Sequence, residues 1–334
     1  MQAVVLGLSG PVLESLDPWL CHDCGDCSAT CPREAEPRQS MATLRRYLTG
    51  QYDRTGLSSR ICRSSAFELG ALGLVALAVL GLIVLYHLTV AKLDLSFVRT
   101  SMGLEHMFPR IQYFTYAVFL IPAFFVASSA YRMFRLTMGS RAVPLRCYLA
   151  EAKALLLNTV AHVQMLHCAA KGRRTKWSMH WLLAFGCVLM AAVKFFFLRW
   201  FQTDRIYPLY HPQRWLGYLG AACLLLGAGE ILAAWVRERK PQHWSSRRSD
   251  LTLPTLLVLT ALSGLAVHAC RYAGAELASH YLYALHLTIA VPMLVVEVPF
   301  GHWSHMIYRP LALYLAAVQA RAAAEQGARE ALVA

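Results

Sequence analysis

Hydrophobic residues in this chain gather in six long runs that are separated by polar segments. A helix needs roughly 20 mostly apolar residues to cross the hydrocarbon core of a bilayer, and each run is about that long. The pattern therefore predicts an all-α protein whose main body is a six-transmembrane helical bundle. The predicted spans are Phe67–Val90, Ile111–Phe134, Trp177–Leu198, Trp215–Val236, Leu253–Tyr272 and His280–Phe300.

The segments outside these runs differ from them in composition. Residues 1–65 are polar and cysteine-rich, which predicts a soluble cytoplasmic module. Residues 148–170 have helical periodicity but carry charged and histidine side chains, which predicts an amphipathic helix at the membrane interface or packed on that module. The Ala-rich, charged tail predicts a cytoplasmic helix. The predicted domains are residues 1–65, 66–308 and 309–334.

Composition and charge support the membrane class. Apolar residues make up 57% of the chain and charged residues only 15%, whereas a soluble domain carries about 25% charged residues. The net charge of +13 does not indicate nucleic acid, because the basic residues lie between apolar runs. Most of them fall in segments on the side of the N-terminus, which predicts cytoplasmic termini. A disordered protein, a secreted disulfide scaffold and an ordinary soluble enzyme are excluded.

A cysteine run is the clearest chemical motif. Residues 21–32 read Cys-His-Asp-Cys-Gly-Asp-Cys-Ser-Ala-Thr-Cys-Pro, which is the C-x2-C-x2-C-x3-C-P spacing of ferredoxins that bind a [4Fe–4S] cluster. Zinc sites favour two C-x2-C pairs separated by a longer loop, so the spacing favours iron and sulfur over zinc. The predicted ligands are Cys21, Cys24, Cys27 and Cys31. Cys62 is an alternative fourth ligand, because the last cysteine of such a run can serve a second cluster.

Histidines in and beside the spans are candidate ligands of b-type haem. Ionisable residues inside a bilayer tend to mark function, and two helical histidines that face one another are the usual protein contribution to such a haem. The chain has no C-x-x-C-H sequence, which excludes a c-type haem. His180 and His305 lie at cytoplasmic ends of spans, whereas His268 and His286 lie near outer ends. Two haems are therefore predicted, one near each membrane face.

Alternatives remain for these assignments. His87 and Met190 are alternatives to His268, and His302 competes with His305. Each histidine can instead hydrogen-bond a neighbouring helix without binding haem. Pro292 and Pro299 are expected to kink or unwind the last span.

Two groups of sequence pieces carry a family resemblance. Trp19-Leu20-Cys21 through Cys31-Pro32-Arg33, with the later Met41-Ala42-Thr43-Leu44, is similar to the helical ferredoxin module in the C subunit of heterodisulfide reductase. The membrane part resembles the E subunit of the same enzyme and, more distantly, the gamma subunit of respiratory nitrate reductase. Both parts in one chain resemble the C subunit of the quinone-interacting membrane-bound oxidoreductases. The pieces in the membrane part are Tyr207-Pro208, His211-Pro212, Leu262-Ser263-Gly264, His286-Leu287 and Pro299-Phe300-Gly301-His302-Trp303-Ser304-His305.

The resemblance implies roles for particular residues. His286 and His305 match the two haem-ligating histidines of the last span, and His180 matches the first of a second pair. Met190 stands ten residues later, where the family has the other histidine. The number of haems, two or one, is therefore left open.

The function that follows is electron transfer. The resemblance implies cytoplasmic flavin- and iron–sulfur-containing partner proteins, menaquinone or ubiquinone as the lipid substrate, and a bacterial or archaeal cytoplasmic (inner) membrane. The expected protein is the membrane subunit of a respiratory, quinone-dependent oxidoreductase with one [4Fe–4S] cluster and haem b. One alternative is a non-redox membrane anchor or sensor with zinc in the cysteine run. Another is a haem relay subunit with no quinone site.

Overall fold

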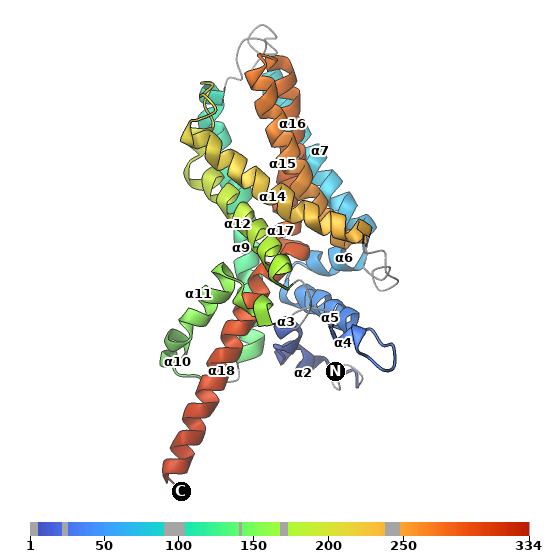
Figure 1. The fold of residues 1–334 in the computed structure, drawn as a ribbon, viewed down its shortest axis with the longest axis vertical. Coiled ribbons are helices and arrows are strands. Elements are labelled where there is room, and N and C mark those ends of the chain that lie inside the picture. Colours follow the sequence, from blue (N-terminus) through green and yellow to red (C-terminus); the bar gives the residue numbers. More distant parts are fainter. Residues whose placement is uncertain are drawn as a thin grey trace. The chain divides into compact units, whose positions relative to one another are not determined.

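The structure is a computed structural model that describes residues 6–21, 26–89, 104–139, 142–167, 173–237 and 248–333. These residues form helices and connecting turns and contain no strand (Figure 1). Six of the helices are long and apolar enough to cross a membrane, as expected for a multi-pass membrane protein. They confirm the predicted all-α, six-span architecture. The spans are Ser65–Thr89, Arg110–Met138, Arg174–Phe196, Pro212–Arg237, Thr252–Tyr272 and the segment that begins at Glu276.

Local capping explains where several spans begin and end. Ser64 accepts a hydrogen bond on its Oγ from the Phe67 backbone N–H at 3.2 Å and so starts α7 (Ser65–Thr89). Helix α15 (Thr252–Tyr272) has Pro254 in its first turn, where a missing N–H costs nothing. Gly274 follows α15 in a left-handed conformation with φ 66°, which glycine adopts without strain. The chain then turns back into α16 (Glu276–Pro292).

The helices belong to two compact units. The first unit comprises residues Met1–Arg63, Phe124–Trp177 and Phe300–Ala334, and the second comprises Ser64–Ala123 and Ser178–Pro299. Helix α9 (Leu104–Met138) runs from the second unit into the first. The predicted boundaries at residues 65 and 308 describe sequence domains and stay predictions.

The first unit is built from short helices and one long one. Its core combines side chains of the N-terminal segment with side chains of α9, α10 and α18, such as Trp19, Met133, Cys147 and Leu315. Burial of these apolar side chains stabilises the unit by removing them from water. The helices are α2 (Ser9–Glu14), α3 (Asp17–Leu20), α4 (Asp26–Ala29), α5 (Pro37–Tyr52), α6 (Leu57–Arg63), α10 (Leu145–Ala150), α11 (Ala152–Val160), η1 (Val163–His167), η5 (His302–Ser304) and α18 (His305–Val333).

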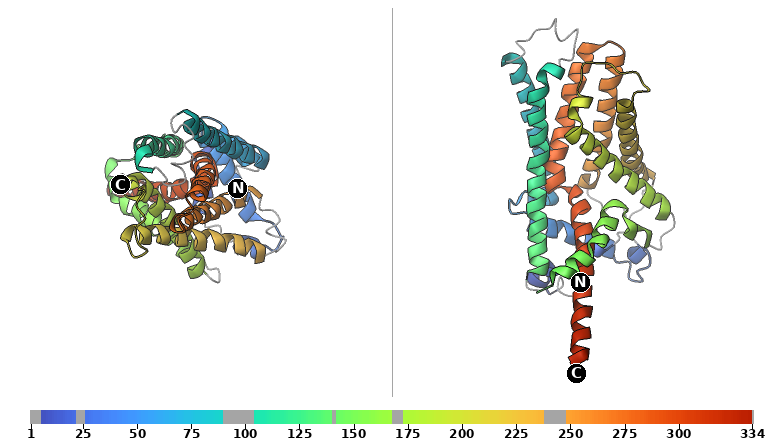
Figure 2. Two further views of the ribbon diagram at one scale, coloured as in Figure 1. Left: turned by 90° about the horizontal axis from the view of Figure 1, so that it is seen from above. Right: turned by 90° about the vertical axis from the view of Figure 1, so that its left-hand side faces the viewer.

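The second unit is a bundle of the apolar helices. Helices α14, α15, α16 and α7 pack in that order, each against the next. Figures 1 and 2 show α15 and α16, both orange, running side by side. A small core of Val79, Val118 and Val291 joins α7, α9 and α16. The remaining elements are α12 (Arg173–Phe196), α13 (Leu198–Phe201), α14 (Pro212–Arg237), η3 (Arg248–Leu251), η4 (Met293–Glu297) and α17 (Val298–Phe300).

The last apolar segment is not one regular helix. Helix α16 ends at Pro292, and the next five residues form the π-helical segment η4. Gly301 is extended, with φ −98° and ψ −153°, before η5 and α18 begin. Proline removes a helical hydrogen bond and crowds the preceding turn. The expected interruption near Pro292 and Pro299 is therefore confirmed.

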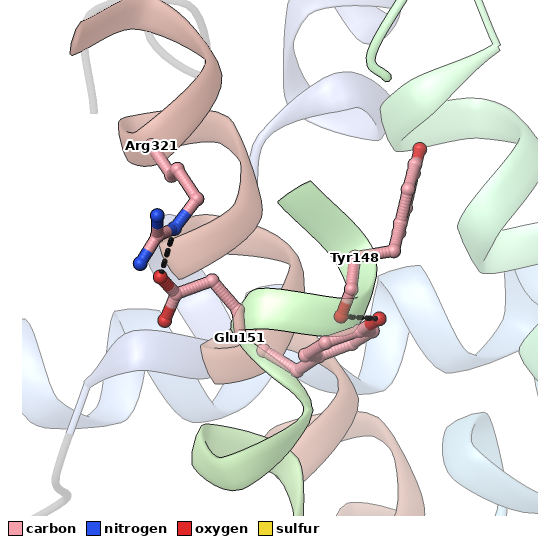
Figure 3. Close-up of polar contacts among 4 residues, drawn as sticks. Tyr148, Glu151 and Arg321 are labelled. Carbon is pink, nitrogen blue, oxygen red and sulfur yellow. Dashed lines mark hydrogen bonds and ion pairs between the residues drawn. The ribbon is translucent and has the colours of Figure 1, made fainter. Parts of the chain in front are cut away.

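The predicted amphipathic helix is broken into pieces. Residues 145–167 form α10, α11 and the 3-10 turn η1, and residues 168–170 lie outside the described part. His162 has a left-handed φ of 49°, which ends the helical run. The pieces pack on α18 of the same unit. Figure 3 shows Glu151 paired with Arg321 at 2.6 Å and the Tyr148 carbonyl accepting a hydrogen bond from Tyr314 at 2.9 Å.

Candidate functional site

The cysteine run lies on short helices of the first unit. Cys21 directly follows α3, Cys27 lies in α4 and Cys31 follows α4, whereas Cys24 lies outside the described residues. The three described thiols are free, Cys27 being exposed and the other two half-buried. Among the described residues no three metal-binding side chains come together. The cluster assignment therefore depends on the spacing of the four cysteines, of which the three described ones form no disulfide.

Two local contacts hold this region in place. The Ser28 hydroxyl of α4 accepts a hydrogen bond from the Arg38 backbone N–H of α5 at 3.3 Å. Glu34 has a left-handed φ of 52°, and its N–H donates to the Cys31 carbonyl at 3.1 Å. The chain after Cys31 thus folds back at once so that α4 contacts α5. This turn positions the end of the motif against a longer helix.

Cys62, the alternative fourth cluster ligand, has a different environment. It lies on α6 and only 8% of it is exposed. It is close enough to the Tyr308 side chain of α18 for an electrostatic interaction. The thiol is therefore part of the interior of the first unit. Its role as a ligand stays a prediction.

His286 of α16 is oriented by a serine of the neighbouring helix. Its Nδ1 lies 2.9 Å from the Ser263 Oγ of α15. The Ser263 hydroxyl already donates to the Thr260 carbonyl at 3.1 Å, so its oxygen accepts and His286 Nδ1 carries the proton. His286 also hydrogen-bonds the Thr260 backbone. This arrangement leaves the Nε2 lone pair for iron, which is the way in which hydrogen-bond partners usually prepare a metal-binding histidine.

Gly264 of α15 leaves room for the ring of His286 because it has no side chain. A Cβ atom at this position would lie 3.4 Å from His286 Cε1 and 3.6 Å from Nδ1. The ring therefore lies directly over the glycine backbone. Lys194 of α12 is also close enough to His286 to interact electrostatically. Because its Nε2 keeps a lone pair and its ring is held in one orientation, His286 fits the role of a haem ligand.

His268 of α15 is engaged at both ring nitrogens. Arg214 donates to its Nδ1 at 3.3 Å, and its Nε2 lies 2.6 Å from the Tyr218 hydroxyl oxygen. An arginine can only donate, so Nδ1 accepts and Nε2–H donates to Tyr218. Neither nitrogen then has a lone pair for iron. Haem binding by His268 stays a prediction, and it requires that the contact with Tyr218 be exchanged for iron.

His268 belongs to a polar cluster that ties α14 and α15 to the preceding loop. Arg271 is only 8% exposed and donates to the Thr203 and Asp204 carbonyls at 3.0 and 3.1 Å. The Arg214 guanidinium lies over the Tyr272 ring, 5.6 Å from its centroid. These contacts provide partners for part of each guanidinium, whereas the buried Nε atoms of Arg214 and Arg271 have no hydrogen-bond partner among the described residues. The cluster stabilises this end of the bundle whether or not His268 binds haem.

The alternatives to His268 lie in different surroundings. The sulfur of Met190 packs against Gly220 of α14, where a Cβ atom would approach it to 2.4 Å. Met190 therefore contributes to the close packing of α12 on α14. His87 of α7 contacts Tyr86 and is close enough to His280 of α16 for an electrostatic interaction. Each of these two assignments stays a prediction.

The predicted inner pair is divided between the two units. His180 is half-buried on α12 in the second unit, and His305 is half-buried at the start of α18 in the first. The side chain of His302 lies outside the described part. Haem binding by His180 and His305 therefore stays a prediction.

Sequence reasoning did not assign roles to Ser263, Tyr218 and Arg214. A signal was present for each. Ser263 and Gly264 stand in one of the pieces that carry the family resemblance, and the structure gives both a position beside His286. Arg214 and Tyr218 are four residues apart and so share one face of α14.

Comparison with known proteins finds two partial relatives. The chain is 28% identical over 152 residues to citrate utilization protein B of Escherichia coli, covering 44% of this chain and 37% of that protein. It is 35% identical over 52 residues to a protein of Archaeoglobus profundus that is described as like the C subunit of heterodisulfide reductase, covering 16% of this chain and 28% of that protein. The aligned parts thus span about a third of the length of these relatives. No family profile and no solved structure matches the chain.

Proposed function

We propose that the chain is the membrane subunit of a respiratory oxidoreductase complex. It passes electrons between a cytoplasmic flavin- and iron–sulfur-containing partner and the membrane quinone pool, through one [4Fe–4S] cluster and b-type haem. The observation that carries this proposal is the union, in one chain, of the C-x2-C-x2-C-x3-C-P run with a six-span body in which Ser263 prepares His286 for iron. Similarity to the heterodisulfide reductase-like protein of Archaeoglobus profundus supports the iron–sulfur part.

The chain's own residues supply ligands and surroundings. Cys21, Cys24, Cys27 and Cys31 would hold the cluster, and His286 would hold one haem through Nε2. His180 and His305 are the proposed ligands of the other haem. A bound iron–sulfur cluster or haem would supply the uptake and release of single electrons, and the protein would supply its ligands and surroundings.

The quinone and the partner proteins are proposed from the family resemblance. A quinone is a neutral lipid-soluble molecule and meets the protein within the bilayer, where the six apolar helices lie. The basic residues around the N-terminal module, such as Arg45, Arg46, Arg60 and Arg63, would attract an acidic redox partner. The proposed protein is the electron-transfer subunit of a quinone-dependent oxidoreductase and acts within that complex.

The first test is a reduced-minus-oxidised optical spectrum of the purified protein. Iron, zinc, acid-labile sulfide and haem are counted on the same sample. The proposal expects b-type haem bands together with about four non-haem irons. A protein with zinc and without haem would contradict it and favour a membrane anchor or sensor.

A second measurement separates quinone chemistry from simple relay. Quinol is added to the oxidised protein in lipid, and haem reduction is followed optically with and without a quinone-site inhibitor. The proposal expects reduction that the inhibitor blocks. Haem that responds only to soluble reductants would support a relay protein without a quinone site.

A further inference from the structure

Three aromatic rings meet in the core of the first unit. They belong to Trp19 of α3, Tyr52 at the end of α5 and Tyr308 of α18, and their exposed fractions are 2%, 0% and 2%. The ring centroids of Trp19 and Tyr308 lie 5.2 Å apart, as do those of Tyr52 and Tyr308. The centroids of Trp19 and Tyr52 are 6.4 Å apart. All three spacings are those of aromatic rings in direct contact.

The contact between Trp19 and Tyr308 connects the two segments that carry predicted cofactor ligands. Cys21, the first cysteine of the run, follows Trp19 by two residues at the end of α3. His305 is the first residue of α18, and Tyr308 lies three residues later. Residues three apart lie on the same side of a helix. One ring of the pair is therefore adjacent to the cluster motif and the other to a proposed haem ligand.

The surroundings of the rings are mostly apolar, although the buried Asp53 carboxylate lies close enough to Tyr308 for an electrostatic interaction. Apolar side chains such as Leu16, Leu48, Met133 and Leu315 pack around them in the same core. The Trp19 indole N–H donates to the Tyr52 hydroxyl oxygen at 3.2 Å. Burial raises the pKa of Tyr52 to about 12, so its hydroxyl stays protonated at physiological pH. The hydrogen bond therefore joins Trp19 to a neutral partner and holds the indole in one orientation.

We infer that the Trp19–Tyr308 contact is the through-protein route for electrons between the cysteine-bound cluster and a haem on His305, an inference that rests on the proposed function. The electron lost by a cluster held by Cys21, Cys24, Cys27 and Cys31 would be the electron gained by a haem held by His305, so the transfer would balance. Neither ring is oxidised and no proton moves. The rings act as the medium across which the electron tunnels, and Tyr52 is a positioning residue that accepts the Trp19 N–H.

The test compares variants that keep a ring with variants that remove it. Trp19→Phe and Tyr308→Phe keep an aromatic side chain, whereas Trp19→Leu and Tyr308→Leu remove it. A soluble deazaflavin photoreductant delivers electrons in a laser flash, and the rise of reduced haem is followed optically. A Cys24→Ser variant, which should lack the cluster, measures direct reduction of haem by the photoreductant. The cluster-dependent rate should fall by an order of magnitude or more in the leucine variants and little in the phenylalanine variants.

Phe134→Leu is the matched control, because it removes a ring of the same core whose aromatic contact is with Tyr148 of α10. Its cluster-dependent rate should stay close to that of the unaltered protein. Spin–spin coupling between the reduced cluster and the oxidised haem, measured by electron paramagnetic resonance, reports their separation independently of any rate. The coupling should be unchanged in all five variants. Methionine at position 19 or 308 provides a second ring-free variant if a leucine variant does not accumulate.

The outcomes are distinct. Unchanged rates in the ring-free variants, with both cofactors present, would overturn the inference. A slow rate accompanied by altered spin coupling would also overturn it, because the rings would then be spacers that set the cofactor separation. Absence of haem or iron from the unaltered protein would instead contradict the proposed function itself.

Discussion

In the proposed haem site, the Ser263 hydroxyl and the Thr260 backbone orient the ring of His286. Ser263 Oγ accepts a hydrogen bond from His286 Nδ1–H, because the Ser263 hydroxyl donates its own hydrogen to the Thr260 carbonyl. Loss of a hydrogen-bond partner that orients a metal ligand typically lowers metal affinity about 10- to 100-fold. The orientation of the ligand thus depends on a residue that never touches the iron.

Ser263→Ala should therefore weaken haem binding at His286 while leaving the fold intact. The expected loss of affinity is about 10-fold or more, measured by haem titration of the apoprotein in lipid nanodiscs. Ser263→Thr keeps the hydroxyl and should retain most of the affinity. His286→Ala marks the full loss of that haem. If the alanine variant at position 263 binds haem as tightly as the unaltered protein, Ser263 does not orient the ligand.

At the residue scale, the sequence indicates which residue types could bind cofactors, and those ligand assignments stay predictions. The cysteine spacing and the position of His286 can be assigned from the chain alone. The hydrogen bond from His286 to Ser263 and the contact of Trp19 with Tyr308 cannot, because each joins residues on different helices. Their pairing depends on how those helices pack, and a single sequence carries no direct record of that packing.

At the scale of elements, α12 and α14 approach closely at small residues. A Cβ atom at Gly227 would lie 2.6 Å from the Leu183 Cβ and 2.9 Å from the Leu183 Cα. Gly186 faces Cys223 in a similar way, with a Cβ approach of 2.8 Å. In a bilayer, helices associate mainly through close van der Waals packing, which small residues permit. These glycines therefore keep the two helices together.

Gly227→Ala should force α12 and α14 apart and destabilise the protein by about 1–3 kcal/mol. Gly229 lies on the same helix with no atom within 4 Å of its added Cβ, so Gly229→Ala is the control. That change should be neutral or stabilising, because alanine is the better helix former by up to about 1 kcal/mol. Thermal unfolding in detergent compares the two. Equal melting temperatures for the two variants would show that α12 and α14 can move apart without loss of stability, which would contradict the prediction.

The elements themselves are the part of the fold that the sequence predicts best. The first five membrane spans are predicted to within a few residues, since bilayer thickness sets the length of an apolar run. The sixth segment runs from Glu276 to Ala328, well past its predicted end at Phe300. Pro292 and Pro299 indicate the interruption of the last span. The break after α11 is harder to predict from sequence. The residue with the left-handed φ there is His162, and histidine is not a residue type that signals this conformation.

At the scale of the whole molecule, the cysteine run and His286 belong to different compact units. Cofactor loss at one should leave the other in place. The two sites can therefore be altered separately and their contents counted separately.

Cys24→Ser should abolish the cluster and leave haem content near normal, as measured by iron, sulfide and haem analysis. Cys62→Ser is the comparison, because that thiol is buried beside Tyr308. It should retain the cluster if Cys21, Cys24, Cys27 and Cys31 form the complete ligand set. Loss of the cluster in Cys62→Ser would identify Cys62 as the fourth ligand.

The first unit is also assembled from three stretches that are far apart in the chain. Its core needs Tyr308, Leu315 and Val318 of α18, which the ribosome adds after almost all of the other helices. Since a chain is made from its N-terminus, the cysteine module spends most of translation without the helix that completes its core. A chain interrupted before α18 would carry an unfinished module, whose exposed apolar side chains are what proteases and chaperones recognise.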